Sequence, residues 1–503
     1  MKLAQRIISG SALNLLDHGV KCASMLILTP VIISHLGLTV YGIWLLLTAA
    51  VSFLNLLDGG ITLSGTRFLA KSLGKKVPGS EPGTVIATLR WLYRWIGLIC
   101  LVTTLGITGA LPLFLKEAEW LETGRMVVLA MGVTTAFRFF LRIHTVVLKS
   151  HLRYDLIVVT SIAKVIVQTI ILLVLLHLEQ GLTALVTGQI VSDILDQLLL
   201  RRFSRRVNEH QGSGPGYSRE LSREILRFSS HTLLNTAGQH LRSRVDPFLV
   251  NAFVGLASVS VYNMGLRLAT LFADLVIAIM GGSLLAGFSY LEGRDGFESV
   301  RRKYFLSLRV SIPFALMGAC GLAALGPPFL IRWLGPEFAD SGRVLEFLIL
   351  PYTLWLMQFP SGSLLLSLNQ HHHLTKLTFA AGLVNVILST ILASIIGFFG
   401  VVLATLIEMS LFYGIAVPIL VSKVLQISLR DYYLAMIRPI LKIGWLVPIL
   451  IYLGRRYSEP DYLSLFWIGT LMAATFAAAS AYFLTSSSER NQLLSRIRTR
   501  FRK

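Results

Sequence analysis

The sequence is poor in charged residues. Asp, Glu, Lys and Arg make up only 14% of its 503 residues, whereas a soluble globular chain carries about a quarter. Long apolar runs recur from end to end, among them GIWLLLTAAVSFLNLL, VIVQTIILLVLL and AGLVNVILSTILASIIGFFG, and the mean hydropathy is +0.69. Each run approaches the ~20 residues that a helix needs to cross ~30 Å of hydrocarbon. The scarcity of charge therefore predicts an all-α integral membrane protein.

Cysteine and recognisable catalytic motifs are also scarce. The three cysteines, Cys22, Cys100 and Cys320, all fall in apolar segments, and an odd, scattered set argues against a disulfide framework or a metal cluster. The sequence has no P-loop, zinc signature or nucleophile elbow, and the HHH tract at 371–373 is only a weak metal indication. We therefore expect no catalytic residue, no metal and no cofactor.

The apolar periodicity predicts fourteen transmembrane helices, with boundaries good to about four residues. They cover residues 7–35, 40–66, 85–111, 126–149, 156–178, 181–200, 225–254, 258–290, 304–330, 344–368, 374–397, 399–422, 433–453 and 463–485. The N-terminus MKLAQR is followed by an apolar segment without a small-residue cleavage site, which predicts a first span rather than a removed signal.

Acidic residues are few, and the basic ones are distributed unevenly. There are 26 Asp and Glu against 46 Lys and Arg, a net charge of +20. With both termini inside, 33 of the basic residues fall in inside segments, six in outside loops and seven within spans. Basic residues concentrate in cytoplasmic loops, so this asymmetry supports the fourteen-span topology. The basic residues of the inside segments are expected to face anionic membrane lipid. No nucleic acid partner is needed to explain the net positive charge.

The chain repeats itself with a period of about 218 residues. Segment 29–44, TPVIISHLGLTVYGIW, resembles segment 246–265, DPFLVNAFVGLASVSVYNMG, and segment 179–195 resembles 397–412. Parallel repeats of this kind are found in transporters, with a substrate site between the lobes. The predicted domains are an N-lobe at 1–200, a basic cytoplasmic linker at 201–224, a C-lobe at 225–425, two extra helices at 426–488 and a basic cytoplasmic tail at 489–503.

These segments resemble a known family. Residues 28–61, LTPVIISHLGLTVYGIWLLLTAAVSFLNLLDGGI, the pattern from Asp246 through Gly255 to Tyr262, and residues 397–425 carry the likeness. The chain is similar to the multidrug/oligosaccharidyl-lipid/polysaccharide exporter superfamily, and within it to the polysaccharide transporter branch, the Wzx-type flippases. The two helices after the second lobe resemble those of polysaccharide and lipid II flippases rather than the twelve-helix drug exporters.

Seven basic residues lie within predicted spans, where a charge at the bilayer centre costs about 2.5–3.5 kcal/mol on insertion scales. They are Lys21, Arg138, Arg142, Lys164, Arg242, Arg244 and Arg267. In a flippase these residues are candidates for binding an anionic diphosphate or its glycan. A guanidinium suits bidentate contact with a phosphate.

Spacing separates structural from functional interpretations of these cations. Asp17 and Lys21 are four residues apart, as are Arg242 and Asp246, so each pair can form within a helix. Arg244 has no acidic residue four positions away.

Arg138 and Arg142 are like charges four residues apart, which predicts an anionic partner. The alternative is that both side chains reach the inner interface.

Four acidic residues are candidates for coupling-ion sites or for counter-ions of the arginines. They are Asp17, Asp58, Asp246 and Asp274. Asp58 and Asp274 are 216 residues apart and so occupy near-equivalent repeat positions, and Arg267 and Asp274 share a helix face. Coupling to H⁺ or Na⁺ is one alternative and transport driven by the membrane potential is the other.

The resemblance implies an undecaprenyl-diphosphate-linked oligosaccharide, such as an O-antigen, capsule or exopolysaccharide unit, moved across the bacterial inner membrane. A polysaccharide polymerase is a candidate partner. The first alternative is a lipid II flippase with the same fold. The second is a cation-coupled multidrug exporter, which would need acidic rather than basic residues in its cleft. A membrane enzyme is disfavoured because the outer loops are short, about 15 residues at most.

The fourteen-span topology places the linker and the C-terminal tail inside the cell. Single cysteines introduced at Ser213 and Ser495 are expected to resist a membrane-impermeant thiol reagent in intact cells and to react after permeabilisation. Labelling of either position in intact cells would contradict this topology.

Overall fold

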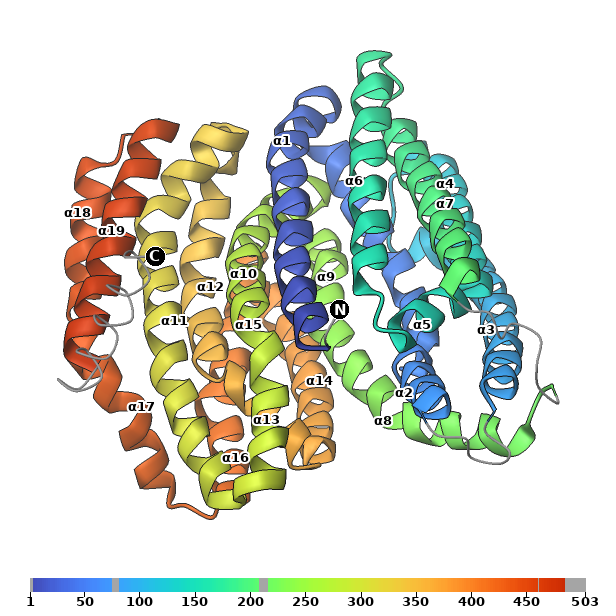
Figure 1. The fold of residues 1–503 in the computed structure, drawn as a ribbon. Helices are drawn as coiled ribbons and strands as arrows, with labels where there is room; N and C mark the ends of the chain where they lie inside the picture. The colour runs from blue at the N-terminus through green and yellow to red at the C-terminus, as the bar shows by residue number, and fades with distance from the viewer. Residues whose placement is uncertain (1–2, 75–80, 208–215, 460, 485–503) are drawn as a thin grey trace, which may run out of the picture. The chain divides into compact units, whose positions relative to one another are not determined.

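The structure is a computed structural model that describes residues 3–74, 81–207, 216–459 and 461–484. Within these ranges nearly every residue is helical and none belongs to a strand (Figure 1). The predicted all-α membrane fold is thus confirmed. Helices satisfy their own backbone donors and acceptors, which hydrocarbon cannot do. Ser213, Ser495 and the predicted tail at 489–503 lie outside the described residues.

The helices divide into two compact units. The first comprises residues 1–260 and 378–398. It contains α1 (Leu3–Ser52), η1 (Phe53–Asp58), α2 (Ile61–Gly74), α3 (Pro82–Ala110), η2 (Leu111–Leu113), α4 (Ala118–Leu141), α5 (Ile143–Ser150), α6 (Tyr154–His177), α7 (Leu182–Val207), α8 (Arg219–Arg244) and α9 (Asp246–Phe253), with most of α14 (His371–Ile396). Neighbours in sequence pack along each other, α3 on α4 and α6 on α7.

The second unit comprises residues 261–377 and 399–503. It contains most of α10 (Leu256–Asp295), then α11 (Phe297–Leu334), η3 (Pro336–Phe338), α12 (Ala339–Met357), α13 (Phe359–Ser367), α15 (Phe398–Leu411), η4 (Phe412–Ala416), α16 (Val417–Leu425), α17 (Leu429–Ile443), α18 (Leu446–Tyr457) and α19 (Tyr462–Leu484). The long helix α11 is central to this unit, because α12, α17, α18 and α19 all pack against it. The predicted lobe boundaries differ from these units and stay predictions.

Each predicted span has a helical counterpart, but the count of fourteen remains a prediction. Among the described residues, ten helices are long and apolar enough to cross a membrane, or eleven if α17 and α18, bent by 43°, form one span. The first, residues 15–74, covers two predicted spans. These two are separated at Gly37, whose φ of 74° is non-helical.

Several predicted spans are broken in the structure. The predicted helix 126–149 divides at Arg142 into α4 and α5, the helix 225–254 divides at Val245 into α8 and α9, and the helix 344–368 divides at Gln358 into α12 and α13. Apolar periodicity continues through such breaks, so it did not reveal them. Each break falls beside polar side chains that the site or the core uses.

Buried polar side chains in the second unit are arranged as a closed network. The Tyr432 hydroxyl donates to Gln358 Oε1 at 2.6 Å and lies 2.8 Å from the Tyr304 hydroxyl. Ser361 donates to the same Gln358 oxygen at 3.0 Å and lies 2.8 Å from the Tyr304 hydroxyl. Because Tyr304 has one proton for two neighbouring hydroxyl oxygens, it donates either to Ser361 or to Tyr432. The network holds α17 against α11 and the α12–α13 break.

Candidate functional site

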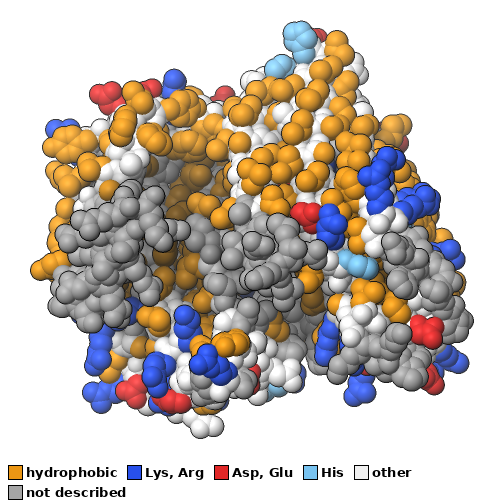
Figure 2. All heavy atoms as spheres, in the orientation of Figure 1, with side chains coloured by type: hydrophobic (Ala, Val, Ile, Leu, Met, Phe, Trp, Pro, Cys, Tyr) orange, Lys and Arg blue, Asp and Glu red, His pale blue; other side chains and the backbone are white. Residues whose placement is uncertain are grey.

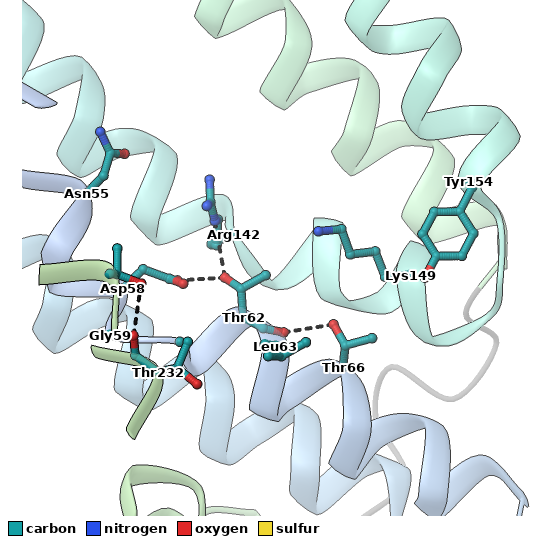
Figure 3. Close-up of a pocket in the computed structure, with 12 residues that line it drawn as sticks. Asn55, Asp58, Gly59, Thr62, Leu63, Thr66, Arg142, Lys149, Tyr154 and Thr232 are labelled. Carbon is teal, nitrogen blue, oxygen red and sulfur yellow. Dashed lines mark hydrogen bonds between the residues drawn. The ribbon is translucent and has the colours of Figure 1, made fainter. Parts of the chain in front are cut away.

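A polar cavity of about 370 Å³ lies inside the first unit. Its walls come from η1, α2, the α4–α5 break, α5, the start of α6 and the middle of α8. The lining residues are Asn55, Asp58, Gly59, Gly60, Thr62, Leu63, Thr66, Arg142, Lys149, Tyr154, Thr232 and Thr236 (Figure 3). The cavity adjoins the segments 67–94 and 149–153, which the sequence predicts to be cytoplasmic, so it belongs to the predicted inner half of the protein.

The turn that forms one wall depends on two glycines. Gly59 and Gly60, directly after Asp58, have φ values of 53° and 84°. Residues other than glycine rarely adopt this left-handed backbone conformation. A Cβ on Gly60 would also lie 2.4 Å from Thr232 Cβ. The sequence DGG therefore ends η1, starts α2 and lets α8 approach closely enough to bring Thr232 into the cavity.

Thr62 is the hub of the cavity's hydrogen bonds. Its hydroxyl donates to Asp58 Oδ1 at 2.6 Å and accepts from Arg142 Nε at 3.3 Å (Figure 3). The Tyr93 hydroxyl lies 3.0 Å from the same oxygen. Because the single hydroxyl proton of Thr62 goes to Asp58, Tyr93 must be the donor in that bond. Arg142 is thus linked to Asp58 through Thr62.

Arg142 and Lys149 bring two cations to the same wall. Arg142 sits at the break between α4 and α5, and among the described residues its guanidinium hydrogen-bonds only to Thr62. Lys149 is half-buried, and its ammonium has no hydrogen-bond or ion-pair partner among the described residues. In Figure 3 the Lys149 ammonium points toward Arg142 and Thr62.

The electrostatics of the cavity favour an anion. Lys149 lies on α5, outside the helices that are long and apolar enough to span a membrane. Burial lowers the pKa of its amine, Arg142 lowers it further, and Asp58 acts in the opposite direction. An anion between the two cations would relieve their repulsion, so the cavity is suited to a phosphate.

The remaining walls carry hydroxyl oxygens. Thr66 donates to the Thr62 carbonyl at 2.8 Å, and Thr236 donates to the Thr232 carbonyl at 2.9 Å. With their protons committed to the backbone, both hydroxyls remain acceptors. Sugar hydroxyl groups could donate to them. The cavity thus combines groups for a phosphate with groups for a glycan.

Two predicted cations have a different environment from Arg142. Lys164 on α6 lies 2.5 Å from Asp193 on α7, and Arg138 on α4 lies 3.6 Å from the same carboxylate. Gln189 donates to Asp193 at 2.8 Å. Asp193 is only 4% exposed, so its charge needs these partners. The structure thus gives Arg138 and Arg142 different partners, where the sequence predicted one shared anion.

Sequence reasoning missed Asp193 as the partner of Lys164. A signal existed, because α6 and α7 are joined by a short turn at 178–181. In such a hairpin, residues equally distant from the turn face each other, and Lys164 and Asp193 are nearly so. Thr62, Lys149 and Tyr93 were also missed, since nothing in their own segments distinguishes them.

The other predicted site residues lie elsewhere. Asp17 and Lys21 form the ion pair that their spacing allows, at 2.7 Å on α1. Arg242 and Arg244 end α8, and the buried Asp246 begins α9 beyond the break at Val245.

Arg267 and Asp274 have exposed side chains on α10 and belong to the second unit. None of these residues lines the cavity.

Comparisons with known proteins agree on a class. A family described as "Polysaccharide biosynthesis protein" matches residues 79–342, just over half of the chain. The chain is 25% identical over 390 residues to the probable flippase AglR of Haloferax volcanii, covering 76% of this chain and 77% of AglR.

Solved structures share the fold at lower identity. The lipid II flippase MurJ, in an inward closed conformation, superimposes with a TM-score of 0.68 at 15% identity, over 94% of this chain and 97% of MurJ. A multidrug resistance MATE family transporter of the MOP superfamily, facing inward, gives a TM-score of 0.65 at 13% identity, over 83% of this chain and 95% of its own. These likenesses concern the fold alone.

The pairing of Lys164 with Asp193 predicts a structural role for this lysine. Lys164→Met should leave the buried Asp193 carboxylate with only Arg138 and Gln189 and lower stability by about 3 kcal/mol, seen as a lower thermal midpoint of the purified protein and lower abundance in membranes. The matched control is Lys21→Met, which opens the more exposed pair with Asp17 and should cost under about 1 kcal/mol. Equal losses in the two variants would contradict a structural role for Lys164.

Proposed function

Because the chain belongs to the polysaccharide biosynthesis protein family, in the polysaccharide transporter branch of the exporter superfamily, we propose that it flips a polyprenyl-diphosphate-linked oligosaccharide from the inner to the outer leaflet. The chain is a multi-pass membrane protein and a flippase-like transporter of polysaccharide biosynthesis. The proposal adds the substrate, its direction of movement and the residues that bind it.

The observation that carries the proposal is that Arg142 and Lys149, two cations, line the same cavity beside hydroxyl groups. A diphosphate offers oxygens to both cations, and the planar guanidinium gives bidentate contact. Thr66, Thr232 and Thr236 would face the first sugar. The undecaprenyl chain would leave the cavity between helices and stay in lipid, so no covalent step and no cofactor is required.

In the absence of substrate, the carboxylate of Asp58 would offset part of the positive charge of Arg142 and Lys149. Thr62 joins its carboxylate to Arg142, so the arginine is held in place before the substrate arrives. Preorganised groups bind more tightly because less ordering remains to be done on binding. In this proposal Asp58 is a counter-ion, and the alternative role as an H⁺ or Na⁺ site is what the coupling test below addresses.

The membrane potential would favour outward movement. A diphosphate of charge about −2 leaving an inside-negative cell gains roughly 4–5 kcal/mol per 100 mV. The cavity adjoins predicted cytoplasmic segments, as a site that loads from the inner leaflet of a bacterial cytoplasmic membrane must. Both termini would be inside, and a polysaccharide polymerase is a candidate partner on the outer side.

A lipid II substrate is the second candidate, since MurJ shares the fold and both substrates would present a diphosphate. The glycan is what separates them. A multidrug exporter is less favoured, because Arg142 and Lys149 outnumber Asp58 in the cavity and would repel cationic drugs.

Loss of the cavity arginine should strongly reduce export without unfolding the protein. Arg142→Ala removes a charge-assisted contact worth about 1.5–3 kcal/mol, so flipping of a fluorescent polyprenyl-diphosphate glycan in proteoliposomes should fall about tenfold or more. Arg142→Lys should restore part of it. The matched control is Arg125→Ala on α4, the helix that ends just before Arg142; it removes an exposed pair with Glu122 and should leave flipping unchanged.

Protein abundance is measured in parallel with flipping for each of these variants. Wild-type flipping in both Arg142→Ala and Lys149→Ala would show that this cavity does not bind the diphosphate.

Potential-driven transport predicts a specific response in vesicles. Clamping the membrane potential to zero with potassium and valinomycin, at a fixed pH gradient, should halt flipping. Removing the proton and sodium gradients at a fixed potential should leave it unchanged. If flipping survives loss of the potential but stops without an ion gradient, coupling passes to the carboxylates Asp58 and Asp274.

A further inference from the structure

A second cavity, of about 520 Å³, lies in the second unit where α10 ends and α11 begins. Its lining includes three basic residues, Arg302, Lys303 and Arg309, and three apolar ones, Leu291, Phe305 and Leu306. None of the described residues that line it is acidic. It shares no residue with the first cavity.

The helix periodicity of α11 places the two kinds of residue along one face. Arg302, Leu306 and Arg309 are spaced by four and three residues, which puts them on the same side of the helix. Leu306 and Val310 are each 44% exposed and continue this face away from the start of α11. In Figure 2 basic side chains gather at the lower edge, where α10 meets α11 in Figure 1, with apolar and some acidic side chains among them.

Two of the three basic residues in this cavity, Arg302 and Lys303, have charged groups that no other described residue binds. Arg302 and Lys303 are exposed, and neither has an ion-pair or hydrogen-bond partner for its charged group among the described residues. Their neighbour Arg301 differs, since it pairs with Glu298 at 3.0 Å and does not line the cavity. Two adjacent arginines on one helix thus differ in whether they are neutralised.

The order of charge and apolar surface matches a lipid. The segment 294–309 is predicted to be cytoplasmic and the span begins near residue 304, so Arg302 and Lys303 lie at the headgroup level of the inner leaflet and Leu306 and Val310 at the level of the first acyl carbons. Arg309 starts at the depth of Leu306 and Val310, and its long side chain extends back toward the start of α11, into the cavity that it lines with Arg302. We propose that this cavity binds one anionic glycerophospholipid of the inner leaflet, with its phosphate on Arg302 and Arg309 and its acyl chains along Leu306 and Val310.

This inference does not rest on the proposed flippase function, because a transporter of any substrate could hold such a lipid. The two cavities also differ in chemistry. The first offers threonine hydroxyls suited to sugars, whereas the second offers leucine and phenylalanine suited to acyl chains. A bound lipid would fix the depth of α11, against which α12 and α17 to α19 pack.

The test is native mass spectrometry of the full-length protein in detergent, titrated with phosphatidylglycerol or with phosphatidylcholine. Wild type should bind one phosphatidylglycerol well before any phosphatidylcholine. Each basic residue near the membrane surface contributes about fivefold to affinity for anionic lipid, so Arg302→Ala/Arg309→Ala should weaken the first phosphatidylglycerol about 25-fold by the same arithmetic. The matched control Arg301→Ala should bind as wild type.

Two further experiments distinguish a bound lipid from free inorganic phosphate. Inorganic phosphate should not displace the lipid, because it lacks acyl chains, and Leu306→Asn should weaken lipid binding without removing a charge. If the double variant does not fold, Arg302→Gln alone is tested with the same readout and an expected loss of about fivefold.

Four results would each overturn the proposal. These are equal phosphatidylglycerol affinity in the arginine variants and wild type, equal affinity for the two lipids in wild type, displacement by inorganic phosphate alone, and preferential occupation by polyprenyl diphosphate. The last would assign the cavity to the transported substrate.

Discussion

The cost of holding charge in a low-dielectric environment shapes the first unit. Asp193 is nearly inaccessible to solvent and is compensated by Lys164, Arg138 and Gln189. Because these groups come from α4, α6 and α7, compensation also fixes how the three helices pack. Arg142 and Lys149 differ from this arrangement, since the described structure gives them one hydroxyl between them. Two cations at one polar cavity, neither held by a carboxylate in direct contact, favour an anion there.

The fold, the family match and the cavity each narrow the function to a different degree. The MurJ and MATE structures show that this helical architecture serves different transporters, so the fold alone does not select a substrate. The family match and the likeness to AglR restrict the class to flippase-like transporters of polysaccharide biosynthesis. Within that class, the cavity offers cations that suit a phosphate and hydroxyl oxygens that suit a sugar.

The sequence alone predicted the all-α membrane architecture, because repeated apolar runs of span length are rare in soluble proteins. It also singled out Arg142 and Asp58, which line the cavity, since a charge within a span is conspicuous. It did not predict the break at Arg142 or the hub role of Thr62, because both depend on how η1, α2 and α5 meet. Lys164 was conspicuous for the same reason as Arg142, yet the structure places it in an ion pair. A buried charge can be read from sequence, but its partner requires the tertiary structure.

The central claim is that the diphosphate of a lipid-linked oligosaccharide rests between Arg142 and Lys149. The most direct measurement is an electron cryo-microscopy map of the protein with a polyprenyl-diphosphate oligosaccharide bound. The account predicts phosphate density within hydrogen-bonding distance of the Arg142 guanidinium and the Lys149 ammonium, with the first sugar beside Thr66, Thr232 or Thr236. Phosphate density at another site, with these two side chains making no contact to the lipid, would contradict it.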